Sequence, residues 1–242
     1  MISRLKILIV SPEVQPFAKT GGLGDISQAL PVALKKMGHD VRVIMPKYGS
    51  VDWSKNACRK LDLPPMAIPI GSEMVQGNLY EASLDNALPI YFVECGLYFD
   101  RKNLYGEDGR EYPDNAERFI FFSRAALEAC KSLEFQPDII HCGDWQTGLI
   151  CAYLKSIYAQ DPFFKKTASV FSIHNLGFQG NYPSALFPLA GLPPELFTMH
   201  GVEFYGAFSM LKAGLVYADA IATVSQPYRR EIMNPENGCG MD

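Results

Sequence analysis

The stretch Leu5-Lys-Ile-Leu-Ile-Val10 leads through the glycine-rich segment Lys19-Thr-Gly-Gly-Leu-Gly-Asp25 into a segment with helical periodicity. The first run is short, apolar around one lysine and rich in β-branched residues, which is typical of a buried parallel strand. From Asp25 to Met37 apolar residues recur at helical spacing. Another β-branched run, Val41–Met45, follows Gly38. The order strand, glycine loop, helix and strand predicts a βαβ unit.

The remainder of the chain mostly repeats this alternation, which predicts an α/β fold with a doubly wound, Rossmann-like parallel sheet. Residues 52–100 differ, because Pro, Gly and Asn separate short strand-like runs, and an irregular or antiparallel insertion is expected there. Leu104–Tyr112 is expected to be a mobile polar loop. The further expected strands are Met74–Leu79, Leu88–Val93, Pro137–His141, Ala168–Ile173 and Ala220–Val224, and the expected helices are Asn115–Ser132, Trp145–Tyr158, Gly206–Tyr217 and Pro227–Met233.

The overall composition is that of an ordinary globular protein. The chain has 242 residues, a formal net charge of -4, 48% hydrophobic residues and 20% charged residues. An acidic balance without a basic stripe argues against nucleic acid as a partner. No apolar stretch reaches the length of a membrane span, and the six cysteines form no CxxC pair that would suggest a zinc site. We therefore expect a cytoplasmic protein that binds neither nucleic acid nor membranes.

The glycine segment lies where a ligand is expected, because ligands bind at the carboxyl ends of strands in a doubly wound sheet. Gly21 and Gly22 allow close approach of the backbone, and the N–H groups of the helix that follows favour an anion. Lys19 adds a positive charge suited to phosphate. These features predict a phosphate or diphosphate site, and they leave open the alternative of a tight turn with structural glycines.

Two other nucleotide-binding motifs do not fit this segment. A Walker loop needs its lysine after the second glycine of GxxxxGK[ST], whereas Lys19 precedes the glycines. A dinucleotide fingerprint needs GxGxxG and an acidic residue after the second strand. Here the GGLG spacing is wrong and Met45-Pro-Lys47 follows the second strand. A nucleotide-dependent oxidoreductase is therefore disfavoured.

Longer stretches around these positions resemble one family. Ser11-Pro-Glu-Val-Gln-Pro-Phe-Ala-Lys-Thr-Gly-Gly-Leu-Gly-Asp25 closely resembles the N-terminal KTGGL signature of glycogen and starch synthases. Further matches follow in the family's order along nearly the whole chain, and together they are highly specific. They are Pro137-Asp-Ile-Ile-His-Cys-Gly-Asp-Trp145, Ser172-Ile-His-Asn-Leu-Gly-Phe-Gln-Gly180, His200-Gly-Val-Glu-Phe204, Ser209-Met-Leu-Lys-Ala-Gly-Leu-Val-Tyr-Ala-Asp219 and Ala222-Thr-Val-Ser225.

The resemblance implies a GT-B glycosyltransferase fold of two Rossmann-like domains, of which residues 1–242 would be the N-terminal, acceptor-side domain. It implies retaining transfer of glucose from ADP-glucose or UDP-glucose to the non-reducing end of an α-1,4-glucan in glycogen biosynthesis, with no cofactor and no bound metal. The family's nucleotide-binding C-terminal domain is absent from this chain, which stops in the glycine-rich segment Gly238–Asp242. We therefore expect a truncated and inactive half of a transferase. A stand-alone glucan-binding module is the alternative.

The resemblance also implies roles for single residues. Lys19 would neutralise the donor diphosphate as the leaving group gains charge, and the backbone at Gly21 and Gly22 would reach the same phosphates. Asp144 is an expected catalytic residue that would accept hydrogen bonds from sugar hydroxyls and favour an oxocarbenium-like state. Because Asp144 immediately precedes an expected helix, a helix N-cap is its alternative role.

Other side chains are placed near the sugars in the same way. His174 is the second expected catalytic residue and Asn175 an expected substrate contact, both at the end of an expected strand. Tyr98 resembles the aromatic residue that borders the acceptor path, where it could stack on a sugar, although Phe99 aligns equally well. Asp25 either caps the first helix or faces the acceptor.

The chain departs from the family pattern around Asp144. The family often has histidines beside this motif, whereas this chain has Gly143 and Gln146. Glutamine keeps hydrogen-bonding capacity but cannot change its charge. The acceptor site is therefore expected to differ in detail, while the class of protein stays the same.

Overall fold

A mixed sheet of nine strands organises the part of the chain that the computed structural model describes, which is residues 4–55, 57–85 and 88–241. The strands are ordered β14-β10-β9-β1-β2-β6-β5-β3, and β4 pairs with β5. Neighbours from β14 to β6 run parallel, whereas β5 is antiparallel to β6. The α/β class with a doubly wound parallel sheet is confirmed, and so is the antiparallel character of the middle section.

The parallel strands are short and apolar because most of them are covered on both faces. Val10 and Val43, on neighbouring strands, are fully buried. Sheet order reverses around β1, since β2 lies on one side of it and β9, much later in the chain, on the other. The parallel strands are β1 (Lys6–Val10), β2 (Asp40–Pro46), β6 (Leu88–Glu94), β9 (Ile139–Gly143), β10 (Ala168–Ile173) and β14 (Ala220–Thr223).

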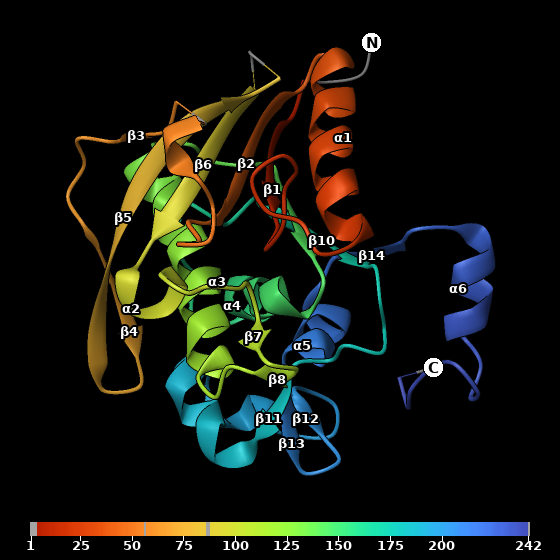
Figure 1. Cartoon of the computed structure of the whole chain (residues 1–242). Coiled ribbons are helices and arrows are strands. Elements are labelled where there is room, and N and C mark those ends of the chain that lie inside the picture. Colours follow the sequence, from red (N-terminus) through yellow and green to blue (C-terminus); the bar gives the residue numbers. More distant parts are fainter. Residues whose placement is uncertain (1–3, 56, 86–87, 242) are drawn as a thin grey trace.

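The antiparallel strands extend the sheet at the side of β6. β5 (Glu73–Leu84) is much longer than the strand expected over part of it, and it pairs with β6, with β3 (Arg59–Lys60) and with β4 (Met66–Ile70). In Figure 1 the β4–β5 ribbon reaches beyond the parallel strands as an arm.

The helices form two groups. α1 (Gly22–Lys36) packs against β2 and β6 and stands alone beside the sheet in Figure 1, whereas α3 (Asn115–Ser132), α4 (Leu149–Lys155) and α5 (Met210–Tyr217) gather together. Gly38 follows α1 with a φ of +98°, a conformation that glycine adopts without strain and that ends the helix. The other helices are α2 (Gly96–Phe99), α6 (Gln226–Ile232), η1 (Trp53–Lys55), η3 (Ser184–Ala190) and η4 (Pro194–Leu196).

Two expected helices are shorter than predicted. The segment that begins at Trp145 starts as a short 3-10 helix, η2 (Trp145–Thr147), before α4. The segment that begins at Gly206 starts as strand β13 (Ala207–Ser209), because its backbone pairs with β11 (Asn181–Pro183) and β12 (Glu203–Phe204). These long-range pairings override the helical periodicity of the sequence.

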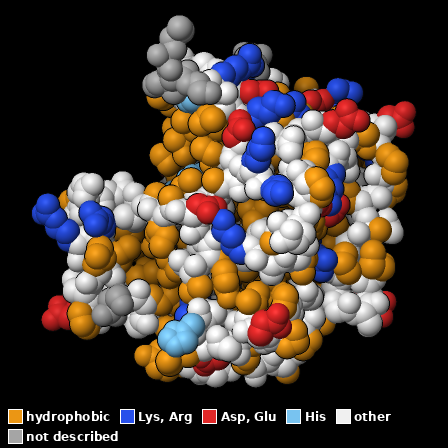
Figure 2. All heavy atoms as spheres, turned by 180° about the vertical axis from the view of Figure 1, so that it is seen from behind, with side chains coloured by type: hydrophobic (Ala, Val, Ile, Leu, Met, Phe, Trp, Pro, Cys, Tyr) orange, Lys and Arg blue, Asp and Glu red, His pale blue; other side chains and the backbone are white. Residues whose placement is uncertain are grey.

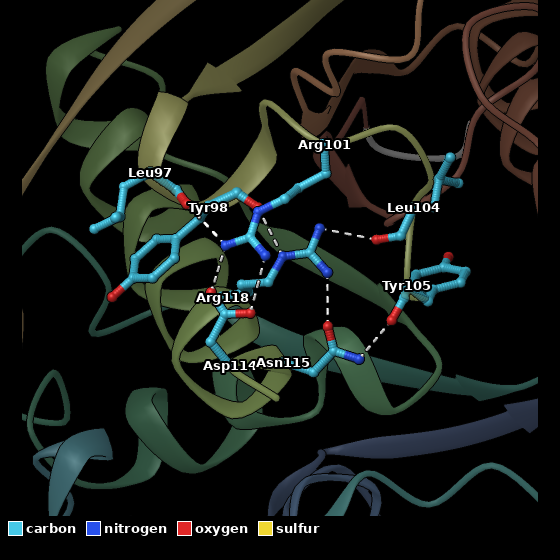
Figure 3. A network of polar contacts seen from close by, with 8 residues as sticks. All are labelled: Leu97, Tyr98, Arg101, Leu104, Tyr105, Asp114, Asn115 and Arg118. Atoms are coloured by element: carbon cyan, nitrogen blue, oxygen red, sulfur yellow. Dashed lines mark hydrogen bonds and ion pairs between the residues drawn. The ribbon is translucent and has the colours of Figure 1, made fainter. Parts of the chain in front are cut away.

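The stretch expected to be a polar loop folds into a small hairpin of β7 (Gly106–Glu107) and β8 (Arg110–Glu111). Fully buried Arg118 of α3 anchors the chain before it (Figure 3), donating hydrogen bonds to the carbonyls of Tyr98 at 2.7 Å and Leu104 at 2.8 Å. Arg118 also donates to the side chain of Asn115, which donates to the carbonyl of Tyr105. A buried cation fixed by carbonyl groups therefore holds this segment in place.

One edge of the sheet is incompletely covered. β14 is the last strand of the order, and most of its residues are exposed. Ile221 and Val224 are more than half exposed, and Figure 2 shows hydrophobic side chains gathered beside a projecting segment of the chain. Among the described residues no helix is long and apolar enough to span a bilayer.

Candidate functional site

The main cavity of the domain lies where the sheet order reverses. It has a volume of about 1360 Å³. Residues that follow three neighbouring parallel strands line it, namely Glu13 after β1, Asp144 after β9 and His174 after β10. In doubly wound folds this switch point, at the carboxyl ends of the strands, is where ligands bind.

The glycine loop forms another wall of this cavity. Gly21 and Gly22 line it, and Gly21 is the extended N-cap residue of α1, with no side-chain cap. The backbone N–H groups of Thr20 and Gly21 donate to the carboxylate of Glu13, at 2.5 Å and 3.3 Å. In this structure Gly21 therefore directs its N–H to a protein carboxylate rather than into the cavity, and the first turn of α1 begins at Gly22.

Lys19 of the glycine loop forms an ion pair with Asp25, and of these two residues only Asp25 lines the cavity. The ammonium of Lys19 lies 2.6 Å from the Asp25 carboxylate, and both side chains are about half exposed. Asp25 belongs to the first turn of α1 and lines the cavity, so it is not the helix cap that the sequence left open. An exposed pair of this kind contributes little stability.

Asp144 occupies a special backbone position between β9 and η2. Its φ of 56° and ψ of -177° lie in a region that side chains other than glycine rarely adopt. The side chain makes no N-cap hydrogen bond to η2. Instead Oδ1 accepts from the backbone N–H of His174 at 2.7 Å and of Asn175 at 3.4 Å. The helix-cap alternative for Asp144 is therefore wrong.

The environment of Asp144 favours its protonated form. Burial raises the pKa of its carboxyl to about 6, against the lowering effect of the His174 and Asn175 amides, and the charge of Glu13 raises it further. A carboxyl that titrates near neutrality in a cavity is typical of functional sites.

Two histidines lie close to this carboxyl. Burial lowers the pKa of His174, while the charge of Glu13 partly counteracts it. His141 of β9 donates or accepts a hydrogen bond with the Ser172 hydroxyl at 2.7 Å, and its pKa falls to about 4 through burial and the nearby His174. Both imidazoles are therefore neutral at pH 7, and each can hydrogen-bond to a ligand hydroxyl without carrying charge.

Asn175 and Tyr98 have different surroundings. Asn175 lines the cavity and accepts a hydrogen bond from the Gly177 backbone at 3.0 Å, which shapes the turn after β10. Tyr98 is buried on α2 and borders a second, smaller cavity with Glu117, whereas the aromatic residues that line the main cavity are Tyr105, Trp145 and Phe178. Tyr98 therefore lies apart from the group around Asp144.

The two departures from the family pattern, Gly143 and Gln146, have different consequences. The first is steric and the second concerns hydrogen bonding. A Cβ at Gly143 would lie 3.2 Å from a methyl of Leu23, so a larger side chain requires that leucine to move. Gln146 lines the cavity and is 6% exposed, and among the described residues its Oε1 has no hydrogen-bond partner. A buried acceptor without a partner beside a cavity is suited to a ligand hydroxyl.

Two site residues escaped the sequence analysis. Glu13 lies inside the quoted N-terminal signature but was given no role, and Tyr105 was assigned to a mobile loop. An acidic residue just after the first strand was the available indication for Glu13. No local pattern could have revealed Tyr105, because its hydroxyl reaches Glu13 across 92 positions of the sequence.

The fold and this cavity define a doubly wound α/β domain with a ligand cavity at its switch point. The sequence profile of the starch synthase catalytic domain family matches residues 6–242. The chain belongs to this family, which confirms the resemblance found in its motifs.

Individual relatives agree with this assignment. The chain is 48% identical over 238 residues to a glycogen synthase of Syntrophotalea carbinolica and 46% identical to glycogen synthase 2 of Geobacter sulfurreducens, in each case covering 98% of this chain and 49% of the relative. Among solved structures it is similar to the catalytic domain of starch synthase IV from Arabidopsis thaliana bound to ADP and acarbose. That match has a TM-score of 0.90 and 29% identity, and it covers 99% of this chain and 48% of the other. The chain thus spans about half the length of these relatives.

Proposed function

We propose that this chain is the acceptor-side half of a retaining glucosyltransferase that extends an α-1,4-glucan in glycogen synthesis, with ADP-glucose or UDP-glucose as the donor. One observation carries the proposal. Asp144, a buried carboxyl fixed by the amides of His174 and Asn175, faces the same cavity as the glycine loop. A sugar bound there would have a hydrogen-bonding carboxyl on one side and helix amides for its phosphate on the other. Family membership and the glycogen synthase relatives add to this support.

The residues of the cavity would divide the work of sugar transfer. Lys19, released from Asp25, would approach the diphosphate, and the amides from Gly22 onward would point at it. Asp144 would accept hydrogen bonds from sugar hydroxyls and stabilise positive charge that develops at the anomeric carbon. Neutral His174 and Asn175 would orient the transferred glucose, and Tyr98 or Tyr105 would contact the acceptor glucan.

The matched part of the relatives amounts to 49% of their length. We infer that the other half supplies the groups that hold the nucleotide. We therefore expect residues 1–242 alone to bind glucan and to show negligible transfer.

The test is a pair of measurements on the chain of 242 residues. Isothermal titrations are carried out with maltotetraose and with ADP-glucose. Saturable binding of maltotetraose, the glucan, is expected. Asp144→Asn should weaken that binding about tenfold, the loss of one charged hydrogen bond. The control Asp62→Asn removes an exposed carboxylate outside the cavity and should bind as the wild type does.

The second measurement follows transfer of labelled glucose from ADP-glucose to glycogen. No incorporation above background is expected. Absence of saturable maltotetraose binding would refute the proposed function, and sustained turnover would refute the expected inactivity of this half.

A further inference from the structure

Glu13 is a buried carboxylate in the wall of the main cavity, and its hydrogen bonds use both of its oxygens. The residue follows β1 and is 3% exposed. Its Oε2 accepts from the backbone N–H groups of Thr20 and Gly21, at 2.5 Å and 3.3 Å. Its Oε1 accepts from the hydroxyls of Thr20 at 2.6 Å and Tyr105 at 2.7 Å. The four donors come from two separate segments of the chain.

These hydrogen bonds connect two walls of the cavity that are distant in sequence. Thr20 belongs to the glycine loop before α1, and Tyr105 lies just before the β7–β8 hairpin. Both residues line the cavity together with Glu13. The carboxylate is therefore the direct link between the loop and the hairpin.

The hairpin side of this link is itself firmly held. The backbone carbonyl of Tyr105 accepts from the Asn115 side chain at 2.9 Å, and Asn115 in turn accepts from buried Arg118 (Figure 3). Tyr105 is thus fixed at its backbone by α3 and at its hydroxyl by Glu13. Movement of the glycine loop relative to this aromatic ring would break hydrogen bonds to a buried charge, which are among the stronger ones.

The same hydrogen bonds exclude a direct chemical role for Glu13. An ionised carboxylate has about four acceptor positions, and donors from the protein occupy both oxygens. A general base or nucleophile needs a free lone pair directed at the substrate. The carboxylate therefore acts through the residues that it holds.

On the basis of the proposed transferase function, we propose that Glu13 is a positioning residue, whose carboxylate fixes the glycine loop against Tyr105 and so sets the shape of the sugar-binding cavity. The amides from Gly22 onward and the ring of Tyr105 then stand at a fixed separation on either side of the ligand. The role is geometric, so a side chain that keeps the hydrogen bonds without the charge should preserve it.

Two substitutions at Glu13 separate geometry from charge. Glu13→Gln keeps a carbonyl for the amides of Thr20 and Gly21, and its NH2 group can donate to the two hydroxyls, which then accept. Maltotetraose affinity measured by isothermal titration should stay within about threefold of the wild type. Glu13→Ala leaves all of these donors without a partner and should weaken binding by at least about tenfold.

Two tyrosine substitutions keep the test valid if Glu13→Ala fails to fold. Tyr105→Phe removes one hydrogen bond of the link and should weaken maltotetraose binding about threefold to tenfold, which corresponds to the net contribution of a typical hydrogen bond. Tyr48→Phe removes a fully buried hydroxyl that, among the described residues, has no hydrogen-bond partner. The affinity of this control for maltotetraose should be unchanged.

The charge of Glu13 affects the pKa of neighbouring groups, and loss of packing alone would not reproduce this effect. Because that charge raises the pKa of both Asp144 and His174, Glu13→Gln should lower both values in an NMR titration, while Tyr105→Phe leaves the charge in place and should lower neither. A Glu13→Gln variant that keeps its affinity while these pKa values fall supports positioning by geometry.

Two results would overturn the proposal. One is wild-type maltotetraose affinity in both Glu13→Ala and Tyr105→Phe. The other is amide hydrogen exchange at Thr20 and Gly21 that is as slow in Glu13→Ala as in the wild type. If the wild type itself binds no maltotetraose, the proposed function fails, and the exchange rates alone then decide the role of Glu13.

Discussion

Replacing Asp144 with asparagine is expected to stabilise the protein at neutral pH. Burial raises the pKa of this carboxyl from 3.8 to about 6 in the folded state. The protonated carboxyl therefore stabilises the folded state fully below pH 3.8. This stabilisation is lost as the pH rises from 3.8 through 6, at about 1.36 kcal/mol for each pH unit and by about 3 kcal/mol in total. Asparagine does not titrate, and its carbonyl can still accept from the amide of His174.

The assay is urea denaturation followed by circular dichroism from pH 4.5 to pH 8. The free energy of unfolding of Asp144→Asn should exceed that of the wild type by about 1 kcal/mol at pH 4.5 and by about 3 kcal/mol at pH 8. A difference that does not grow with pH, or a variant less stable than the wild type at pH 7, would refute the reasoning.

Asp219→Asn is the matched control with the opposite sign. Burial would raise the pKa of Asp219, but hydrogen bonds from Lys155 and Ser169 outweigh it and keep the pKa below its ordinary value. Its carboxylate therefore contributes stability above that ordinary pKa, and the contribution is lost as the pH falls. The variant should be less stable than the wild type at pH 7, with the gap narrowing in acid.

Three further results are expected. The pKa of partly buried His141 is about 4, against an ordinary value of 6.5, so the wild type should lose about 3 kcal/mol of stability as the pH falls through this range. His141→Gln should flatten the acid side of the stability profile, and parallel profiles of the two proteins would contradict this. Gly180→Ala should destabilise by on the order of 2–4 kcal/mol in urea, because φ is +57° and the new Cβ would lie 2.4 Å from Trp145. Gly206→Ala, with positive φ but open space, should cost only about 1–2 kcal/mol, and equal losses would disprove the steric argument. Gln146→Leu should leave the melting temperature nearly unchanged or higher while weakening maltotetraose binding, and undiminished binding would exclude a sugar contact.

The sequence is most informative where a segment is both periodic and buried. The helix Asn115–Ser132 and the strand Ala168–Ile173 have the predicted bounds, since a continuous apolar pattern leaves few alternatives for such segments. Prediction failed at Gly206, where the start of a helical pattern is a strand. The pairing of β13 with β11 and β12 decides that segment, and local periodicity carries no information about such partners.

The site was predictable as a set of positions but not as an arrangement. Asp144 and His174 meet at the cavity as the strand ends suggested, yet the side chain of Asp144 binds amides 30 positions further along instead of capping its own helix. Glu13 could not be given a role because the donors that it binds come partly from Tyr105, in a segment that looks like a loop. Hydrogen bonds between distant segments depend on the completed fold, which a local pattern does not encode.

The reversal of sheet order at β1 also affects the order in which the chain can assemble during synthesis. β1 is central, but its neighbour β9 follows so late that the backbone of Lys6 bonds to a side chain 132 positions onward. At about 5–20 residues per second, a ribosome needs roughly 7–26 seconds to supply that partner. Throughout this interval one edge of a strongly apolar strand is unpaired, so protection of nascent chains by chaperones should matter more for this domain than for one whose central strands are adjacent in sequence.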